Sequence, residues 1–477
     1  MKKQIFLFAA LVLFSFISAS QINLNRFKNS LTNSESSSSK SDYTKEAYND
    51  ASVTSNTSPK FKNEGREWYI SKSRGSGQLG TKERPAKDLG NIIHKLNPND
   101  VIYIAAGTYL SKGEMGSDEI NVPVKIYGGF DESFSKRDPW GEYKTILTGT
   151  NDYMKSTQPR LYISTTKQRE ENGQYATGSE IIVDGLIIDN GPRNRYHEDK
   201  GLAIRRTAHG PSNHNPSPES GGIVIAGSKY TNITVQNCVV MNTAPTQGAL
   251  SVMVYQGGKG IVFNNLCINN TGNGIQLKTG YVGSDDALIP TFYVQNNTSL
   301  FNWKHDPIAS YGGNALKTDQ NLKVTLEKNV FGFGHMGGVY SQSTPMVMNN
   351  NLFTGNLKYD FKERNTMMNV DEILDESVHL SQYSEGNESA LIQLNIAERW
   401  ANLYAERQIL SREEVDASVS ASNSGANQLR SMLGLNLQGN SVSTNAEIFL
   451  HKLELDEGLP VGFMTWNGKG CAKPVFK

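Results

Sequence analysis

A short phrase repeats between residues 181 and 356, and this repeat limits the folds open to the chain more than any other feature. The phrase reads apolar residue, any residue, polar residue, Asn, two to four mostly apolar residues, then usually a second Asn. It occurs in 233–242, 262–270 and 294–302, and more loosely in 326–331 and 348–353. The Asn residues taken as equivalent are Asn237, Asn265, Asn297, Asn329 and Asn351. Successive steps between them are 28, 32, 32 and 22 residues, which indicates a solenoid of stacked repeats.

A second short run follows the phrases at 275–279, 314–318 and 339–341. These runs alternate at period two and lack helical spacing, so they predict strands. One strand cannot bury its apolar face alone, so repeated units must stack in parallel and share a core. Asn suits the turns between strands because it tolerates the left-handed backbone region and can bond its neighbour in the next repeat.

This pattern resembles the right-handed parallel β-helix superfamily of pectate-lyase-like secreted proteins, over roughly Glu67 to Asn356. The run from Gly80 to Tyr109 also looks like the opening of many β-helix proteins. We therefore expect an all-β fold, a right-handed parallel β-helix solenoid over 65–362. An N-terminal capping helix and an α-rich C-terminal segment, 363–477, complete the predicted organisation.

The N-terminal 64 residues divide into two segments before the predicted β-helix. Residues 1–20 join two lysines, an apolar run and small residues, which is typical of a cleaved signal peptide. Residues 21–64 are rich in Ser, Thr and Asn and predict a disordered tether. We expect a secreted, periplasmic or cell-surface protein with no membrane span, because no later stretch is long enough to cross a bilayer.

Charge and cysteine content exclude several classes of protein. Lys plus Arg and Asp plus Glu are 47 each, so the net charge of zero gives no general attraction to nucleic acid. The three cysteines have no zinc-site spacing with histidine. Gly75, Gly77 and Gly80 have the spacing of a dinucleotide-binding motif, but 81–85 intervenes where that motif needs a helix to begin.

Three further segments have recognisable character. Residues 86–96 carry Leu89, Ile92, Ile93 and Leu96 at helical spacing, and predict a helix that covers the first coil. Residues 389–408 have one apolar helical face, and 411–414 is a capping box that starts another helix. Residues 190–221 form a polar insertion with Arg205 and Arg206, which we expect in a loop that walls a groove.

Two lysines stand out on the repeated strands. Leu277-Lys278-Thr279 and Leu316-Lys317-Thr318 align, which predicts that Lys278 and Lys317 point outward from adjacent coils. Tyr340 follows on the next coil, and Tyr255 lies near the same ladder. Like charges across neighbouring strands are destabilising, so this pair favours an anionic partner, an acidic polysaccharide. Alternatively, the lysines extend into solvent or pair with nearby carboxylates.

β-Elimination of a uronic-acid polysaccharide requires a base that removes the proton next to a carboxylate. A lysine whose pKa is lowered by a neighbouring cation can serve. We assign Lys317 as the base, Lys278 to charge stabilisation and Tyr340 as proton donor. Candidate substrate-binding residues are Tyr255, Arg205, Arg206, His305 and His335.

The sequence is similar to the β-helix alginate and chondroitin lyases, which implies Lys and Arg near a calcium ion. The strand before Lys278 has no Glu-any-Glu pair, so calcium is a possible cofactor with Asp285, Asp286 and Asp319 as candidate ligands. Ser284-Asp285-Asp286 also resembles the paired Asp of polygalacturonase-type hydrolases. A hydrolase is therefore the second hypothesis for an enzyme. A third alternative is a non-catalytic adhesion or structural protein, since the β-helix fold occurs in enzymes and in non-catalytic proteins.

Overall fold

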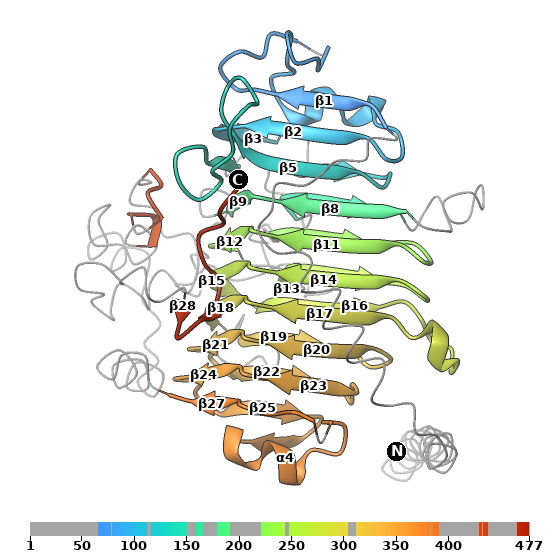
Figure 1. The fold of residues 1–477 in the computed structure, drawn as a ribbon, viewed down its shortest axis with the longest axis vertical. Coiled ribbons are helices and arrows are strands. Elements are labelled where there is room, and N and C mark those ends of the chain that lie inside the picture. The colour runs from blue at the N-terminus through green and yellow to red at the C-terminus, as the bar shows by residue number, and fades with distance from the viewer. Residues whose placement is uncertain are drawn as a thin grey trace, which may run out of the picture. The chain divides into compact units, whose positions relative to one another are not determined.

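The computed structural model describes residues 65–77, 79–111, 116–149, 159–165, 179–190, 221–243, 248–303, 312–381, 383–390, 429–431, 433–436 and 465–476. The described chain is mostly β, with three nine-stranded sheets (Figure 1). The predicted signal peptide and tether lie outside the described residues. In the described ranges, no helix is long and apolar enough to cross a membrane.

From β2 to β25, each sheet takes every third strand of the chain. Sheet A contains β1 (Glu67–Ile70), β2 (Val101–Ala105), β5 (Lys125–Phe130), β8 (Glu180–Asp184), β11 (Asn232–Gln236), β14 (Lys259–Phe263), β17 (Thr291–Gln295), β20 (Lys323–Glu327) and β23 (Met346–Asn349). Sheet B contains β3 (Gly107–Leu110), β6 (Thr145–Thr148), β9 (Leu186–Asp189), β12 (Val239–Met241), β15 (Leu266–Thr271), β18 (Thr298–Trp303), β21 (Val330–Gly332), β24 (Leu352–Thr354) and β27 (Glu388–Ser389).

Sheet C contains β4 (Asp118–Ile120), β7 (Leu161–Ser164), β10 (Ile223–Ala226), β13 (Gly248–Val254), β16 (Asn273–Thr279), β19 (Asn314–Thr318), β22 (Gly337–Ser341), β25 (Tyr359–Glu363) and β26 (Thr366–Met368). Strand pairs within the sheets are parallel, apart from antiparallel β25–β26. The chain thus visits sheets A, B and C in turn, which is consistent with the predicted β-helix.

One apolar cluster fills the space between the three sheets. Alternate side chains contribute to it, among them Ile233 and Val235 from β11, Val240 from β12, and Leu250 and Val252 from β13. Each strand would leave this face in water if it stood alone, and burying it contributes about 25 cal/mol per Å² of apolar surface. The parallel stack is therefore the arrangement that the period-two pattern requires.

A ladder of Asn side chains runs through the turns between sheets A and B. Each side-chain nitrogen donates to the side-chain oxygen of the next Asn at 2.9–3.0 Å, in the order Asn265, Asn297, Asn329, Asn351 and Asn387. The first four are fully buried, so the ladder satisfies polar groups that would otherwise be costly. The predicted equivalence of Asn265, Asn297, Asn329 and Asn351 is confirmed.

The assignment of Asn237 to this ladder is wrong. Gln236 pairs with Phe263, so Asn237 corresponds to Asn264, and Cys238 takes the ladder position. The Cys238 backbone nitrogen donates to Asn265 Oδ1 at 3.0 Å. Asn237 and Asn264 instead take left-handed turn conformations, both with φ 54°. Two Asn residues stand together in the later repeats, and either suits a turn. The sequence therefore did not show which of the two corresponds to Asn237.

The predicted N-terminal helix over 86–96 is also wrong. Two 3-10 turns stand there, η1 (Leu89–Asn91) and η2 (Ile93–Lys95). Leu89, Ile92 and Leu96 are nevertheless buried in the central cluster, so the segment still covers the apolar interior. Gly90 followed by Asn91 lowers helix propensity, which explains why an apolar pattern at helical spacing does not produce an α-helix here.

The described parts of the C-terminal region lie against the outer face of sheet B. Leu429 and Leu435 are buried with outward side chains of that sheet, such as Val239, Leu266 and Leu300. The Arg430 guanidinium forms a buried ion pair with Asp189, Nε to Oδ2 at 2.7 Å. This region therefore packs along the side of the stack, and the helices predicted over 389–408 and 411–414 lie largely outside the described residues.

The last described residues cross several coils as an extended chain, which Figure 1 shows in red beside β15 and β18. A small hairpin, β28 (Thr465–Trp466) and β29 (Lys469–Gly470), begins this segment. The Cys471 backbone nitrogen donates to Thr298 Oγ1 at 2.9 Å. Ala472 exchanges two hydrogen bonds with the Asn264 side chain, at 2.7 and 2.9 Å.

A short irregular segment follows β25 at the end of the stack. It contains β26, η5 (Val370–Glu372) and α4 (Ile373–Glu376), and it buries Val370 and Ile373 in the central cluster. β27 then pairs with β24, so parallel pairing continues to Ser389.

Candidate functional site

The outer face of sheet C brings together most of the described residues that the sequence pointed to. The two predicted lysines do not stand opposite each other, however. Lys317 pairs with Gln276, and Lys278 pairs with Met253 on the preceding strand. A shift of two residues leaves every side chain on its original face, so alternation could not distinguish this register from the predicted one.

An Asn pair marks the true register. Asn314 Nδ2 donates to Asn273 Oδ1 at 2.9 Å, and both side chains are buried. Aligning these two residues places Lys317 beside Gln276, as observed. Tyr359 continues the row, since its hydroxyl donates to Asn314 Oδ1. Gly337 makes this contact possible, because a Cβ there would lie 2.1 Å from Tyr359 Cε2.

Tyr340 stands directly beside Lys317, as the sequence predicts, and Lys362 stands on its other side. The Lys317 ammonium lies 5.6 Å from the centre of the Tyr340 ring, and the Lys362 ammonium lies 5.1 Å from it. All three side chains are partly exposed. Two cations near one ring are attracted by its electron-rich face, which orders them on this surface. Lys362 was missed because it stood at the predicted end of the β-helix.

Asp319 and Lys278 complete the cluster. The Asp319 backbone nitrogen donates to Leu277 O at 3.0 Å, which carries the ladder one step beyond Thr318 and places Asp319 beside Lys278. Burial raises the pKa of the Asp319 carboxyl, while Lys278, Lys317 and a hydrogen bond with Gln276 lower it. The carboxylate therefore interacts with both ammonium groups at once.

The environment of Lys317 favours loss of its proton. Burial lowers the pKa of Lys317 below its usual value, Asp319 raises it in part, and Lys278 lowers it further. Desolvation and a like charge both disfavour the protonated form. Lys317 thus differs from an ordinary surface lysine.

Tyr255 lies just after β13, within the same part of sheet C. Its ring occupies the space beside Gly280, where a Cβ would lie 2.1 Å from Tyr255 Cε1. Tyr255 is partly exposed and adjoins the strand that carries Met253, the neighbour of Lys278. Tyr255 therefore lies at the edge of the face that carries the lysine cluster.

Two of the three candidate calcium ligands, Asp285 and Asp286, form contacts outside the lysine cluster. Asp285 caps η4 (Asp286–Leu288) by accepting from the Ala287 backbone nitrogen at 3.0 Å. Asp286 pairs with Lys323 at 2.6 Å. In the portions of the chain that are described, no three His, Cys, Asp or Glu side chains gather, whereas calcium needs six to eight oxygen ligands. These residues do not fit a calcium site, nor do Asp285 and Asp286 form a free carboxylate pair.

The remaining predicted site residues do not join the cluster. His335 is only 5% exposed, and its ring packs edge-on to Trp303 at 6.1 Å. His335, named from the sequence as a candidate substrate-binding residue, is therefore a buried side chain. Arg205, Arg206 and His305 lie outside the described residues.

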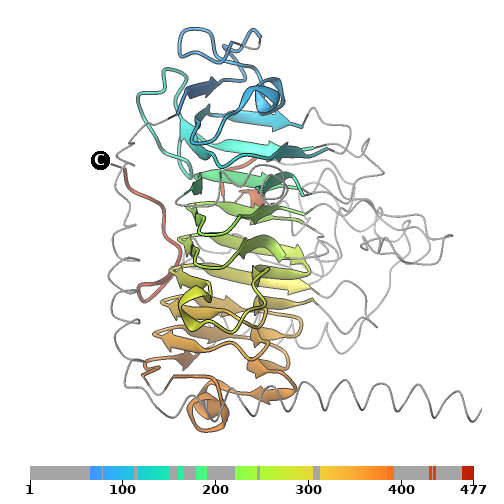
Figure 2. The same cartoon turned by 90° about the vertical axis from the view of Figure 1, so that its right-hand side faces the viewer.

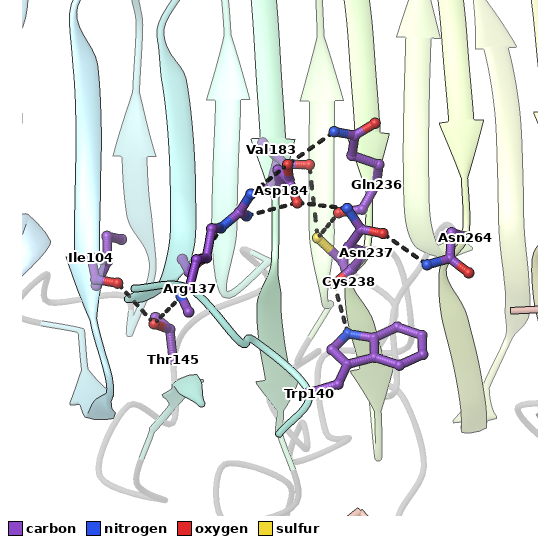
Figure 3. Close-up of polar contacts among 12 residues, drawn as sticks. Ile104, Arg137, Trp140, Thr145, Val183, Asp184, Gln236, Asn237, Cys238 and Asn264 are labelled. Carbon is purple, nitrogen blue, oxygen red and sulfur yellow. Dashed lines mark hydrogen bonds and ion pairs between the residues drawn. The ribbon is translucent and has the colours of Figure 1, made fainter. Parts of the chain in front are cut away.

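A second polar network lies at the turns between sheets A and B (Figure 3). Asp184 is fully buried and pairs with Arg137 at 2.8 Å. It also accepts from Gln236 Nε2 and Asn237 Nδ2, both at 2.9 Å. Trp140 Nε1 donates to Asn237 O at 2.7 Å. This network ties the 131–144 loop to the stack, and its burial makes it a structural feature rather than a binding surface.

No family model matches the sequence, and no curated protein matches it significantly. Among solved structures, the chain is similar to a rhamnogalacturonan lyase, with 12% identity, 69% of this chain and 90% of that chain covered, and a TM-score of 0.24. It is also similar to a pectin methylesterase from Aspergillus niger, with 10% identity, coverage of 74% and 98%, and a TM-score of 0.23. A complex of XylC with xylose gives 10% identity, coverage of 68% of each chain and a TM-score of 0.21. Likenesses of this size carry no argument about activity, so function must be argued from the site.

Proposed function

We propose that this chain is a secreted, periplasmic or cell-surface protein with a right-handed parallel β-helix, which binds and cleaves an acidic polysaccharide by β-elimination. The observation that carries this proposal is the cluster of Lys278, Lys317 and Lys362 on one face of sheet C, with the carboxylate of Asp319 beside Lys278 and Lys317. Among the four residues of this cluster, three lysines stand with one aspartate, so positive charge exceeds negative charge. An anionic ligand would relieve the repulsion.

The proposed reaction assigns one role to each group. Lys317 Nζ, in its neutral form, takes the proton next to the sugar carboxylate. The electrons form a carbon–carbon double bond as the bond to the β-oxygen breaks, and Tyr340 Oη gives a proton to that leaving oxygen. Lys278 and Lys362 neutralise the carboxylate, whose negative charge increases as the proton leaves. General base catalysis of this kind contributes roughly 10²–10⁴-fold to a rate.

Two observations support this assignment. The depressed pKa of Lys317 favours the neutral form that a base requires. Tyr340 lies between Lys317 and Lys362, so a donor, a base and a neutralising cation occupy adjacent strands. A polymer that contacts all three would lie across the strands of sheet C, and Tyr255 could contact a sugar face nearby.

The test is to replace Lys317 with Ala and measure the formation of unsaturated sugar ends on a uronic-acid polysaccharide. We expect the rate to fall roughly 10²–10⁴-fold while binding of the polymer persists, because Lys278 and Lys362 remain. Lys259→Ala on β14 of sheet A is the matched control and should leave the rate unchanged. Retained turnover in Lys317→Ala would refute the role of the base. Binding without turnover in the unaltered protein would instead favour the adhesion alternative.

A further inference from the structure

At both ends of the stack, part of the chain covers strand edges of the sheets. At the β1 end, the chain folds back on β1: Tyr69 N donates to Gly80 O, and Ala86 N donates to Tyr69 O, at 2.9 and 2.8 Å. At the other end, β26 covers the edge of β25, and Leu380 bridges Met346 of β23.

The β1 end is basic. Residues 65–97 contain seven Lys and Arg against three Asp and Glu, a formal net charge of +4. Two of those carboxylates are already engaged, since Asp88 pairs with Lys72 at 3.5 Å and Glu67 accepts from the Tyr69 hydroxyl at 2.6 Å. Exposed cationic side chains here include Arg74, Lys82, Arg84 and Lys87. One large apolar side chain, Leu79, is 54% exposed beside them.

The opposite end, which carries α4, is acidic and apolar. Residues 364–385 contain five Asp and Glu against one Arg, a formal net charge of −4. The exposed carboxylates are Asp371, Glu372, Asp375, Glu376 and Glu385. Apolar side chains lie among them: Met367, Leu374, Val378 and Tyr383 are 46, 55, 77 and 54% exposed. Four of the nine large apolar side chains exposed among the described residues are thus found in this segment.

These two surfaces belong to opposite ends of the stack. β1 is the first strand of sheet A, whereas β26 is the terminal strand of sheet C beside β25. Figure 2 shows the blue N-terminal strands and the orange α4 segment at opposite ends of the sheets. A whole chain with zero net charge therefore presents opposite charge at its two ends.

We propose that a second copy of this chain docks head to tail, with the basic β1 end of one molecule against the acidic, apolar α4 end of the next. The opposite charges attract, and the cluster of Leu374, Val378, Met367 and Tyr383 gains by leaving water. Because the two surfaces differ, the contact is heterologous, and its repetition produces rings or open chains. The contact is argued from the charges and apolar side chains of the two ends and not from the lysines of sheet C, so this inference does not depend on the proposed function.

Charge reversal at either end provides the test. Surface ion pairs are individually weak and screened by salt, so the contact should be reversible. In sedimentation velocity of the full chain at low ionic strength, we expect the average mass to rise with protein concentration and to return to that of a monomer near 1 M salt, where the Debye length is about 3 Å. Lys82→Glu/Arg84→Glu, and separately Asp375→Lys/Glu376→Lys, should each weaken association about tenfold or more.

Mixing the two variants distinguishes a specific contact between the β1 end and the α4 end from an effect of the altered net charge. Each double reversal changes the formal charge of one end by four and so brings that end to zero. The unaltered basic end of one variant still complements the unaltered acidic end of the other, so an equimolar mixture should associate again. Because restored association requires folded partners, it also excludes misfolding. Lys229→Glu/Lys259→Glu, which reverses two charges away from the ends, is the control and should associate like the unaltered protein.

Three results would overturn the proposal. The unaltered chain could remain monomeric at low salt at every concentration. Association could survive both reversals, which would place the contact elsewhere. Finally, the mixture could fail to associate when each variant has the same circular dichroism spectrum as the unaltered protein.

Discussion

The pKa of Lys317 depends on the residues that surround it. Gln276 and Tyr340 stand on either side of it along the sheet, while Asp319 and Lys278 lie one step away. Sequence alone identified Lys317, Lys278 and Tyr340 as outward residues, because alternation fixes which face a side chain occupies. It could not fix which residues stand side by side, because a two-residue shift preserves alternation.

The pH dependence of cleavage tests the surroundings of Lys317. The rate should rise with pH as Lys317 loses its proton, at a pKa below the usual value for lysine. Asp319 raises that pKa, so Asp319→Asn should move the rising limb to lower pH. Lys278 lowers it, so Lys278→Ala should move the limb to higher pH. Shifts in the same direction for both variants would contradict this account, and the profile of kcat against pH measures them.

The Asn ladder joins successive coils through buried hydrogen bonds between equivalent side chains. Asn297 donates to Asn329 Oδ1 and accepts from the backbone and side-chain nitrogens of Asn265, at 2.9–3.0 Å. Because the repeat was visible as doubled Asn residues, the stack itself could be predicted from the sequence. The true ladder position of Cys238 could not, since a cysteine carries no sign of the turn that it occupies.

Removal of one ladder residue should be costly. Asn297→Ala leaves the donors of the buried Asn265 without their acceptor, and each buried unsatisfied group costs about 1–3 kcal/mol. Urea unfolding should therefore show a loss of at least about 1–3 kcal/mol. Asn387→Ala, at the partly exposed end of the ladder, is the matched control and should cost less. Equal losses at both positions would show that the ladder does not act through buried acceptors.

The packing of the C-terminal region on sheet B is the second element-scale feature. Sheet B strands carry apolar residues on both faces, as in Leu266, Cys267 and Ile268, where Cys267 lies in the central cluster and the other two face outward. A strand without polar alternation indicates a covered outer face. This signal was present in the sequence, but it did not reveal which segment covers the sheet.

The buried pair Arg430–Asp189 tests that packing. Arg430→Ala leaves the Asp189 carboxylate buried without its cation, which typically costs about 3–5 kcal/mol. Asp189→Asn combined with Arg430→Met removes both charges, so the double variant should regain part of the loss. Denaturant unfolding of the single and double variants measures this difference. If Arg430→Ala has no effect, the pair does not hold the C-terminal region on the sheet.

For the whole molecule, a regular repeat predicted the general arrangement far better than the details of its ends. Parallel β-structure from Glu67 onward follows from period-two strands that share one core. The predicted helix over 86–96 failed because local propensity at Gly90 and Asn91 outweighed the apolar spacing. Asp285 and Asp286, two of the three candidate calcium ligands, instead form a cap and an ion pair, which their closeness in sequence could not reveal.

The most direct test of the proposed activity is to incubate the protein with a panel of uronic-acid and sulfated polysaccharides, while following the absorbance of unsaturated ends together with reducing ends. We expect both signals to rise together on an acidic polymer, and both to disappear in Lys317→Ala. Reducing ends without an absorbance rise would contradict β-elimination and indicate hydrolysis. Absence of both signals across the panel would contradict the enzymatic account.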